Sequence, residues 1–309
     1  MAKKRQEKPE RMVLVDGNAI LHRAYHALPP LTTRSGELVN AVYGFSSMLL
    51  KILNELKPKC IAVSFDTSKP VFRHQEFIGY KANRPRMDSE LVDQIKRVRE
   101  VVRAFNIPIY EIDGYEADDV IGSIARQVVK ERGLEIVIVT GDKDFMQLVD
   151  KKVKLYMPVR GLSEAQLVGR REVEEKMGLA PGKIIDYKGL VGDPSDNYPG
   201  VPGIGPKTAT ELLQRFGSLE GVYQHLGEIK SQSVVKKLAE GAESAVLSKK
   251  LATILTDAPI TVEMEKCSLA DFNKEKVSAL FKELGFRSLV ARLGGEKERE
   301  KPKPQPTLF

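Results

Sequence analysis

Short apolar runs, each followed closely by an aspartate, are the feature that most restricts the fold of this chain. They are rich in β-branched residues and alternate with stretches of helical spacing, which predicts a mostly parallel sheet with helices on both faces. The clearest runs are residues 12–15, 60–65 and 135–140. Asp16, Asp66 and Asp142 follow them. Because ligands of such sheets bind beyond the carboxyl ends of the strands, we expect these carboxylates to share one pocket.

Residues 108–112 predict another strand, which leads into three carboxylates within four residues: Glu116, Asp118 and Asp119. Apolar residues with helical spacing follow directly, so the acids belong to the first turn of a helix. Acids there complement the helix dipole by about 0.3–1 kcal/mol each, yet three neighbours repel one another. A divalent cation would turn that repulsion into a ligand set. Taken alone, the triad supports both interpretations equally; the aspartates after the other strands favour the cation.

A basic, helix-prone stretch at residues 69–105 interrupts the alternation of strands and helices. If its first part is helical, Lys81 and Arg84 share a face because they are three residues apart. Pro85 would end that helix, and a second helix would cover about residues 88–104. A solvated helical hairpin is the simpler interpretation of the later lysines and arginines. Lys81 and Arg84 are better candidates for phosphate contacts.

The second half of the chain becomes helical, with further strands expected only at residues 152–157 and 260–262. A turn-rich loop at residues 192–197 carries two more acids, Asp193 and Asp196. Short polar residues and glycine are typical of such loops. We therefore add these two carboxylates to the candidates for the pocket.

Residues 200–209 (GVPGIGPKTA) lie between two helical patterns. Gly203 and Gly205 allow a close approach of the backbone, and Pro206 suits the first position of a helix. The pattern is typical of a helix–hairpin–helix element, which holds DNA phosphate through backbone amides and a helix N-terminus. An ordinary glycine-rich helix start is the alternative.

Cysteine content and the lack of long apolar stretches indicate a protein of the reducing cytoplasm. No uninterrupted apolar stretch approaches the ~18 residues of a membrane span. Cys60 and Cys267 are too few for a disulfide framework or a thiolate metal site. The formal net charge is +7, although the candidate pocket is acidic. A basic surface around an acidic metal pocket is the arrangement that a metal-dependent nuclease needs.

The two ends of the chain differ in composition from the rest. Residues 1–11 are polar and basic and predict a frayed arm. Residues 294–309 are charged and rich in proline, which predicts an unstructured, extended linker. The last five residues, QPTLF, break that composition with two apolar side chains.

These motifs together resemble the bacterial 5′-3′ exonuclease family, that is, the N-terminal nuclease domain of DNA polymerase I and its stand-alone relatives. The resemblance extends more distantly to the flap endonucleases and covers roughly residues 12–290. It rests, in chain order, on residues 15–17 (VDG), 64–66 (SFD), 80–84 (YKANR), 116–119 (EADD), 140–144 (TGDKD), 192–197 (GDPSDN) and 200–209. The family implies a fold with a PIN-like nuclease core, a helical arch and a helical DNA-binding subdomain.

The resemblance also implies two divalent cations held by carboxylates. Asp16, Asp66, Glu116 and Asp118 would surround the first cation. Asp119 would lie between the two, and the second would use Asp142, Asp144, Asp193 and Asp196. Mg²⁺ or Mn²⁺ suits such an all-oxygen set, whereas the lack of histidine and cysteine among these positions argues against zinc.

For the reaction, the family implies cleavage of DNA that carries free 5′ ends, nicks or 5′ flaps, with RNA primers among the substrates and a 5′-phosphate as product. Lys81 and Arg84 would stabilise charge on the phosphate. Residues 69–105 would form the arch over the single-stranded 5′ end, and the hairpin would hold duplex DNA with a monovalent cation such as K⁺. The DNA-binding residues would be Arg23, Tyr80, Gly203, Gly205, Lys207 and Thr208.

The tail adds an expectation about a partner. No polymerase domain follows residue 309, so the chain is either an excised domain or, as we expect, a stand-alone nuclease. The last five residues resemble the short peptides that dock in the bacterial sliding clamp, with Gln305, Leu308 and Phe309 as the contacts. A flexible linker ending in apolar anchors suits tethering by effective concentration. An inert tail is the alternative.

We accordingly expect a monomer with an α/β nuclease core at residues 12–180 and a helical DNA-binding subdomain at residues 181–293. Two other functions use similar residues. A PIN-like metal-dependent RNase shares the acids after the strands, but the hairpin argues against it. A non-catalytic protein that binds DNA junctions would tolerate missing carboxylates, yet all nine positions are filled.

Overall fold

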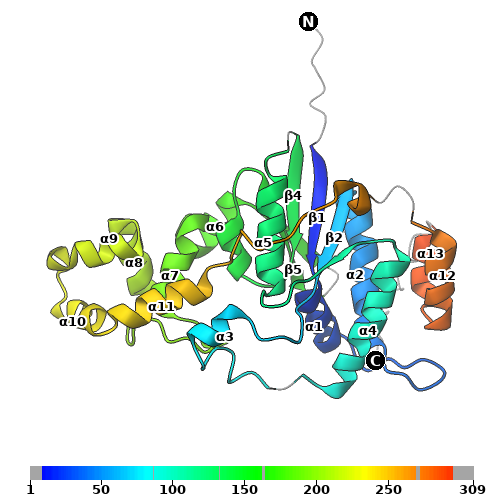
Figure 1. Ribbon diagram of the computed structural model, residues 1–309, viewed down its shortest axis with the longest axis horizontal. Helices are drawn as coiled ribbons and strands as arrows, with labels where there is room; N and C mark the ends of the chain where they lie inside the picture. Colours follow the sequence, from blue (N-terminus) through cyan, green and yellow to red (C-terminus); the bar gives the residue numbers. More distant parts are fainter. Residues whose placement is uncertain (1–8, 86, 132, 162–163, 269–271, 295–309) are drawn as a thin grey trace, which may run out of the picture.

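A parallel sheet organises the chain, as expected. The computed structural model describes residues 9–85, 87–131, 133–161, 164–268 and 272–294 (Figure 1). The strands of this part are β1 Glu10–Asp16, β2 Cys60–Ser64, β3 Ile109–Tyr110, β4 Leu134–Val139, β5 Val153–Arg160 and β6 Glu164–Val168. They form one sheet in the order β3-β2-β1-β4-β5-β6, in which only the pair β5–β6 is antiparallel.

The register of the central strands fixes where their ends lie. β1 pairs with β2 from Met12↔Cys60 to Asp16↔Ser64, so the two strands end side by side. β4 lies on the other side of β1, with Val15 opposite Val139. The three chain segments that follow these strands therefore leave the sheet at one edge.

Helices cover both faces of the sheet because successive strand residues point to opposite sides. Val13 and Val15 belong to a core with α1 Gly17–Ala27, α2 Asn40–Leu56 and α4 Ser89–Ala104. Met12 and Leu14 belong to a second core with α5 Ala117–Val128 and α6 Arg170–Met177. All four of these β1 side chains are at most 1% exposed, which places the sheet centre in the interior.

A helical unit with its own core follows the sheet. It contains α7 Ile184–Val191, α8 Pro206–Phe216, α9 Leu219–Gln224, α10 Gln232–Glu240 and α11 Ala242–Ala252. Figure 1 shows α8 to α11 at one end of the molecule and α12 Lys274–Glu283 and α13 Arg287–Leu293 at the other. Phe281 of α12 and Leu289 of α13 are fully buried in the core that α2 and α4 share. The subdomain expected at 181–293 therefore needs a correction, because its last two helices pack on the α/β core.

Three other details differ from the expectations. Residues 260–262 form no strand, and the antiparallel strand β6 was not anticipated. Residues 78–84 form turns in place of a helix, after the short α3 Phe72–Glu76. The loop at 193–197 explains the turns, since the Lys81 amide donates to the Asp196 carbonyl at 2.9 Å and Asn197 Nδ2 donates to the Gly79 carbonyl at 2.7 Å. The helix expected at about 88–104 is α4, and the strand expected at 152–157 is β5.

Within the described ranges, no helix has both the length and the apolar character that crossing a membrane requires.

Candidate active site

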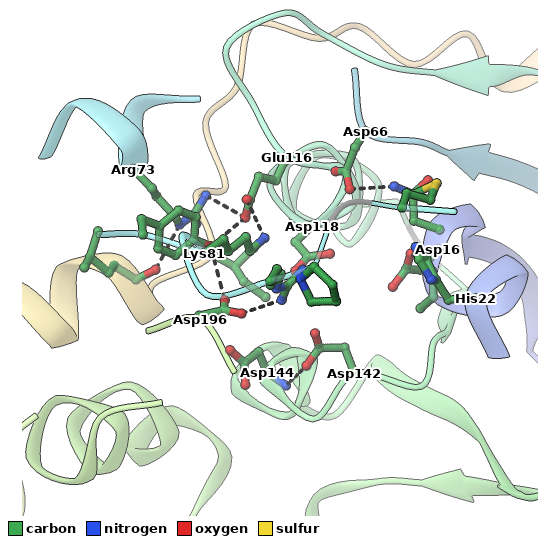
Figure 2. Close-up of a pocket in the computed structure, with 18 of the residues that line it drawn as sticks. Asp16, His22, Asp66, Arg73, Lys81, Glu116, Asp118, Asp142, Asp144 and Asp196 are labelled. Atoms are coloured by element: carbon green, nitrogen blue, oxygen red, sulfur yellow. Dashed lines mark hydrogen bonds and ion pairs between the residues drawn. The ribbon is translucent and has the colours of Figure 1, made fainter. Parts of the chain in front are cut away.

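A cavity of about 680 Å³ lies where the central strands end, and seven of the nine predicted carboxylates line it (Figure 2). β1, β2 and β4 deliver acids from the sheet edge, and the N-terminus of α5 and the loop after α7 deliver the others. The seven are Asp16, Asp66, Glu116, Asp118, Asp142, Asp144 and Asp196. The expectation that acids after separate strands meet in one pocket is thus met.

Hydrogen bonds fix the carboxylates of Asp16 and Asp66. Asp16 is the N-cap of α1, where its Oδ1 accepts from the Ala19 amide at 2.9 Å. Its Oδ2 accepts from Thr140 Oγ1 at 2.8 Å, which links the ends of β1 and β4. Asp66 accepts from the Ala117 amide at 2.7 Å and from Asn18 Nδ2 at 2.6 Å. Helix capping and pocket formation therefore use the same side chains.

Lys81 and Arg84 line the cavity together with Arg73. Lys81 Nζ lies 2.6 Å from Glu116 Oε1, and Arg84 forms an ion pair with Asp196. Tyr80, which we expected to bind DNA, is only 3% exposed. Its hydroxyl donates to Glu116 at 3.1 Å and to Asp196 at 3.2 Å. The structure thus assigns Tyr80 to holding two carboxylates.

Lys188, which the sequence did not mark as a site residue, pairs with two of the acids expected to hold the second cation. Lys188 Nζ lies 2.6 Å from Asp144 Oδ1 and also pairs with Asp193. Asp193 further accepts from the Ser195 hydroxyl at 2.6 Å and does not line the cavity. Lys188 sits on α7, far in sequence from the first strands, so no local pattern marked it as part of the site.

Crowding of carboxylates shifts their protonation equilibria. Burial raises the pKa of Asp16 to about 7, with hydrogen bonds opposing the rise and neighbouring carboxylates adding to it. Burial, followed by the charge of Asp16, raises the pKa of Asp118 well above its ordinary value. The pKa of Asp144 rises to about 6 through burial and the charge of Asp142. For Asp193, burial acts to raise the pKa, but Lys188 and Ser195 outweigh it and lower the pKa.

These shifts bear on whether the site suits a cation. In the described part of the chain, no three histidine, cysteine or carboxylate side chains converge as closely as a finished metal site requires. The acids nevertheless supply only oxygen donors, and Figure 2 shows Asp118 near the centre of the group with no hydrogen bond to another drawn residue. Burial accounts for most of the raised pKa values and repulsion between carboxylates adds to it, and a divalent cation would offset both by favouring the ionised form. The donor set therefore fits a hard cation such as Mg²⁺.

Asp119 is placed differently from our expectation. Its side chain is fully buried and does not line the cavity. Arg73 Nη1 and Nη2 donate to its two oxygens at 2.7 and 2.8 Å, and the Glu116 amide donates to Oδ2 at 3.2 Å. The position between two metals is thus corrected: Asp119 is a buried partner of Arg73 that also caps the start of α5.

The predicted hairpin lies between α7 and α8. Gly203 has φ +80, a conformation that glycine adopts without strain, and Pro206 is the first residue of α8. Lys207 and Thr208 occupy the first turn of α8. Elsewhere, Arg23 Nε donates to the Gly161 carbonyl at 2.8 Å from an exposed position. DNA contacts by these residues, and by Gly205, remain predictions.

Two predictions concern residues outside the described ranges. Most of the N-terminal arm belongs to residues 1–8, and the tail with Gln305, Leu308 and Phe309 belongs to residues 295–309. Binding to a sliding clamp stays a prediction.

Comparison with known proteins identifies the family. Residues 11–178 match the family described as "5'-3' exonuclease, N-terminal resolvase-like domain", and residues 179–275 match "5'-3' exonuclease, C-terminal SAM fold". The chain belongs to the 5′-3′ exonuclease family. The PIN-like RNase class is thereby set aside.

Relatives of this chain include DNA polymerase I of Bacillus subtilis (strain 168), which is 44% identical over 92% of the chain. DNA polymerase I of Caldicellulosiruptor bescii is 47% identical, also over 92% of the chain. The aligned segment makes up 32% and 33% of these relatives, so the chain spans about a third of their length.

Solved structures share the fold at low sequence identity. T5 5′-exonuclease with bound zinc matches with a TM-score of 0.68 at 19% identity, over 93% of this chain and 97% of that one. The catalytic core of Rad2 in complex with DNA substrate matches with a TM-score of 0.59 at 16% identity, over 93% and 92%. These matches confirm the expected fold.

Proposed function

We propose that this chain hydrolyses phosphodiester bonds in DNA that carries 5′ flaps, nicks or free 5′ ends, and that it requires divalent cations. The observation that carries the proposal is the cavity in which seven carboxylates face Lys81 and Arg84. Family membership supports the reaction class. The T5 D15 flap endonuclease, which shares this fold, has been crystallised as a pseudo-enzyme-product complex with DNA and metal ions.

Two groups of carboxylates suit two cations. The first cation would be held by Asp16, Asp66, Glu116 and Asp118. The second would be held by Asp142, Asp144 and Asp196. Asp193 would act on the second cation indirectly, through the residues beside it. Mg²⁺ or Mn²⁺ bound there would supply a water of lowered pKa and positive charge beside the scissile phosphate. Zinc is less suited, since the proposed ligands are all carboxylates, although His22 and His26 also line the cavity.

The chain's own residues would position the phosphate and stabilise its charge. Lys81 and Arg84 enter the cavity on a turn that the loop at 193–197 fixes, so their cationic groups are preorganised. Each is paired with a carboxylate in this structure, and a phosphate with its cations would compete for that pairing. The cationic groups of Lys81 and Arg84 would thus exchange their carboxylate partners for the phosphate.

A cleavage assay tests the proposal. The protein is incubated with 5′-flap, nicked and single-stranded DNA in Mg²⁺ or Mn²⁺, beside the double variant Asp142→Ala, Asp144→Ala. Asp113→Ala serves as the control, because Asp113 is exposed and lies outside the cavity. We expect the parent and the control to cleave the DNA and to release 5′-phosphate products. The double variant should not cleave it. Cleavage that persists in the double variant or in chelator would contradict the proposal, and binding without cleavage by the parent would favour a junction-binding protein.

A further inference from the structure

Lys81 has a backbone conformation that lysine rarely adopts. Its φ is +54°, in the left-handed region that a β-carbon makes unfavourable. A residue keeps such a conformation only where its surroundings impose it, and residues of this kind cluster at functional sites. The side chain of Lys81 lines the acidic cavity, with Nζ 2.6 Å from Glu116 Oε1 (Figure 2). The unfavourable conformation therefore occurs at the residue whose ammonium would face the phosphate.

Hydrogen bonds at Lys81 and just before it impose this conformation. Its amide donates to the Asp196 carbonyl at 2.9 Å, and its carbonyl accepts from the Arg84 amide at 3.0 Å. Two residues earlier, the Gly79 carbonyl accepts from Asn197 Nδ2 at 2.7 Å. Of these three bonds, only the one from Asn197 depends on a side chain. A substitution at Asn197 therefore removes one restraint on the turn and leaves the backbone groups of the other two in place.

Asn197 is suited to this contact by its own backbone. Its φ is +61°, and asparagine tolerates the left-handed region better than most residues that carry a side chain. Asn197 is exposed and does not line the cavity, so it acts on the reaction only through its neighbours. Asn83 makes a similar contact after Lys81, where its Nδ2 donates to the Pro194 carbonyl at 2.8 Å. Two asparagine amides thus join the turn at 78–84 to the loop at 193–197.

We propose that Asn197 is a positioning residue for cleavage, which holds the turn before Lys81 so that the lysine ammonium faces the scissile phosphate. The inference rests on the proposed function and adds to it a residue that does not touch the substrate. Its consequence is specific: removing the Asn197 side-chain amide should slow cleavage only while Lys81 is present. The alternative is that Asn197 acts through its neighbour Asp196, a proposed ligand of the second cation, and the experiment separates the two.

Single-turnover cleavage of 5′-flap DNA in Mg²⁺ tests the inference through a double-mutant cycle with Lys81→Met. Asn197→Gly removes the donor and keeps the left-handed backbone free of strain, whereas Asn197→Asp removes the donor and adds a charge. We expect each variant to cleave about tenfold more slowly than the parent, since a displacement of about 1 Å can cost about 10²-fold. In the Lys81→Met background, the same changes should slow cleavage by less than about twofold.

Gln127→Glu is the matched control, because it too exchanges an amide for a carboxylate. Gln127 is exposed, lies outside the cavity and donates to the Ile260 carbonyl at 2.5 Å. Its variant should cleave within about twofold of the parent rate. Thermal unfolding with and without Mg²⁺ adds a measurement that does not depend on cleavage. The rise in Tm on adding Mg²⁺ should be the same for Asn197→Gly as for the parent, since the second cation would keep its ligands.

Three results would overturn the inference. The first is a cleavage rate within about twofold of the parent's in either Asn197 variant. The second is the same fold-loss with and without Lys81, and the third is a smaller rise in Tm with Mg²⁺ for Asn197→Gly, which would place the effect at the second cation. Each of these results leaves the proposed function in place as long as the parent cleaves the DNA. A parent that does not cleave it would overturn both.

Discussion

The Arg73 guanidinium donates to both oxygens of the Asp119 carboxylate inside the protein, at 2.7 and 2.8 Å. Arg73 is 2% exposed and also donates to the carbonyls of Leu251 and Thr253 at 2.9 and 2.8 Å. The Leu255 amide donates to Asp119 as well, at 2.8 Å. One buried ion pair therefore joins α3, the start of α5 and the segment that leaves α11, directly behind the carboxylates of the cavity.

Replacing Arg73 with Met should lower the free energy of unfolding by about 3–5 kcal/mol, because the buried Asp119 charge would lose its partner. Chemical denaturation measures the change. The exposed pair Arg170–Glu174 provides the matched control, since Arg170→Met should cost less than about 1 kcal/mol. The double variant Arg73→Met, Asp119→Leu should recover part of the loss. A loss for Arg73→Met no larger than the control's would contradict the structural role of the pair.

Local sequence predicts the parts of the site that follow from strand ends. Asp16 and Asp66 lie at the same edge of the sheet because the neighbouring parallel strands β1 and β2 end there. This rule can be applied without knowing any tertiary contact. The hairpin and the first residue of α8 follow equally from glycine and proline. The fold class is predictable for the same reason, since periodicity is a local property.

Contacts between distant segments account for what the sequence did not show. Lys81 lies in a turn because its amide donates to the carbonyl of Asp196, which is 115 positions further along the chain. Helix propensity depends on local sequence and therefore cannot predict that bond. Asp119 differs from Asp118 because Arg73 of α3 and the Leu255 amide bind its carboxylate. Lys188 joins the acids through the packing of α7. In each case tertiary context decides between side chains of the same type.

Lys81→Met should reduce kcat for DNA cleavage by about 10²–10³-fold, because a cation aimed at the phosphate acts mainly on the transition state. Binding of uncleaved DNA should change much less. Lys130→Met is the control, since Lys130 is exposed just beyond α5 and away from the cavity. Single-turnover kinetics separates the two effects. An effect confined to DNA affinity would show that Lys81 serves binding alone.

Asp118→Asn should stabilise the metal-free protein at pH 8. Burial, and then the charges of Asp16 and its neighbours, raise the pKa of Asp118 well above 3.8, and burial raises that of Asp16 to about 7, so the folded protein holds these protons more tightly than the unfolded chain. Their contribution to stability is therefore present below about pH 4 and is lost as the pH rises to about 7. Removing the neighbouring Asp118 charge should raise the Tm in EDTA at pH 8, by about 2–4 °C for each kcal/mol of repulsion removed, and change it little at pH 5.

Asp193→Asn provides a control of opposite sign for this experiment. The carboxylate of Asp193 pairs with Lys188, and its pKa is lowered. Its contribution to stability is therefore present at pH values above its pKa in the unfolded chain, and the variant should lose that contribution at pH 8. Added Mg²⁺ should raise the Tm of the parent at pH 8 more than that of Asp118→Asn. A lower Tm for Asp118→Asn in EDTA at pH 8 would refute the account of carboxylate repulsion.

Tyr198→Phe should stabilise the protein by about 1 kcal/mol, because burying a hydroxyl without a partner costs about 1–3 kcal/mol. Tyr198 is 2% exposed, and its hydroxyl has no hydrogen-bond partner among the described residues. Tyr80 is equally buried, but its hydroxyl donates to two carboxylates of the cavity, so Tyr80→Phe should destabilise by about 1 kcal/mol or more. Urea denaturation of the two variants measures both changes. Destabilisation of similar size in both would mean that Tyr198 has a hydrogen-bond partner in solution.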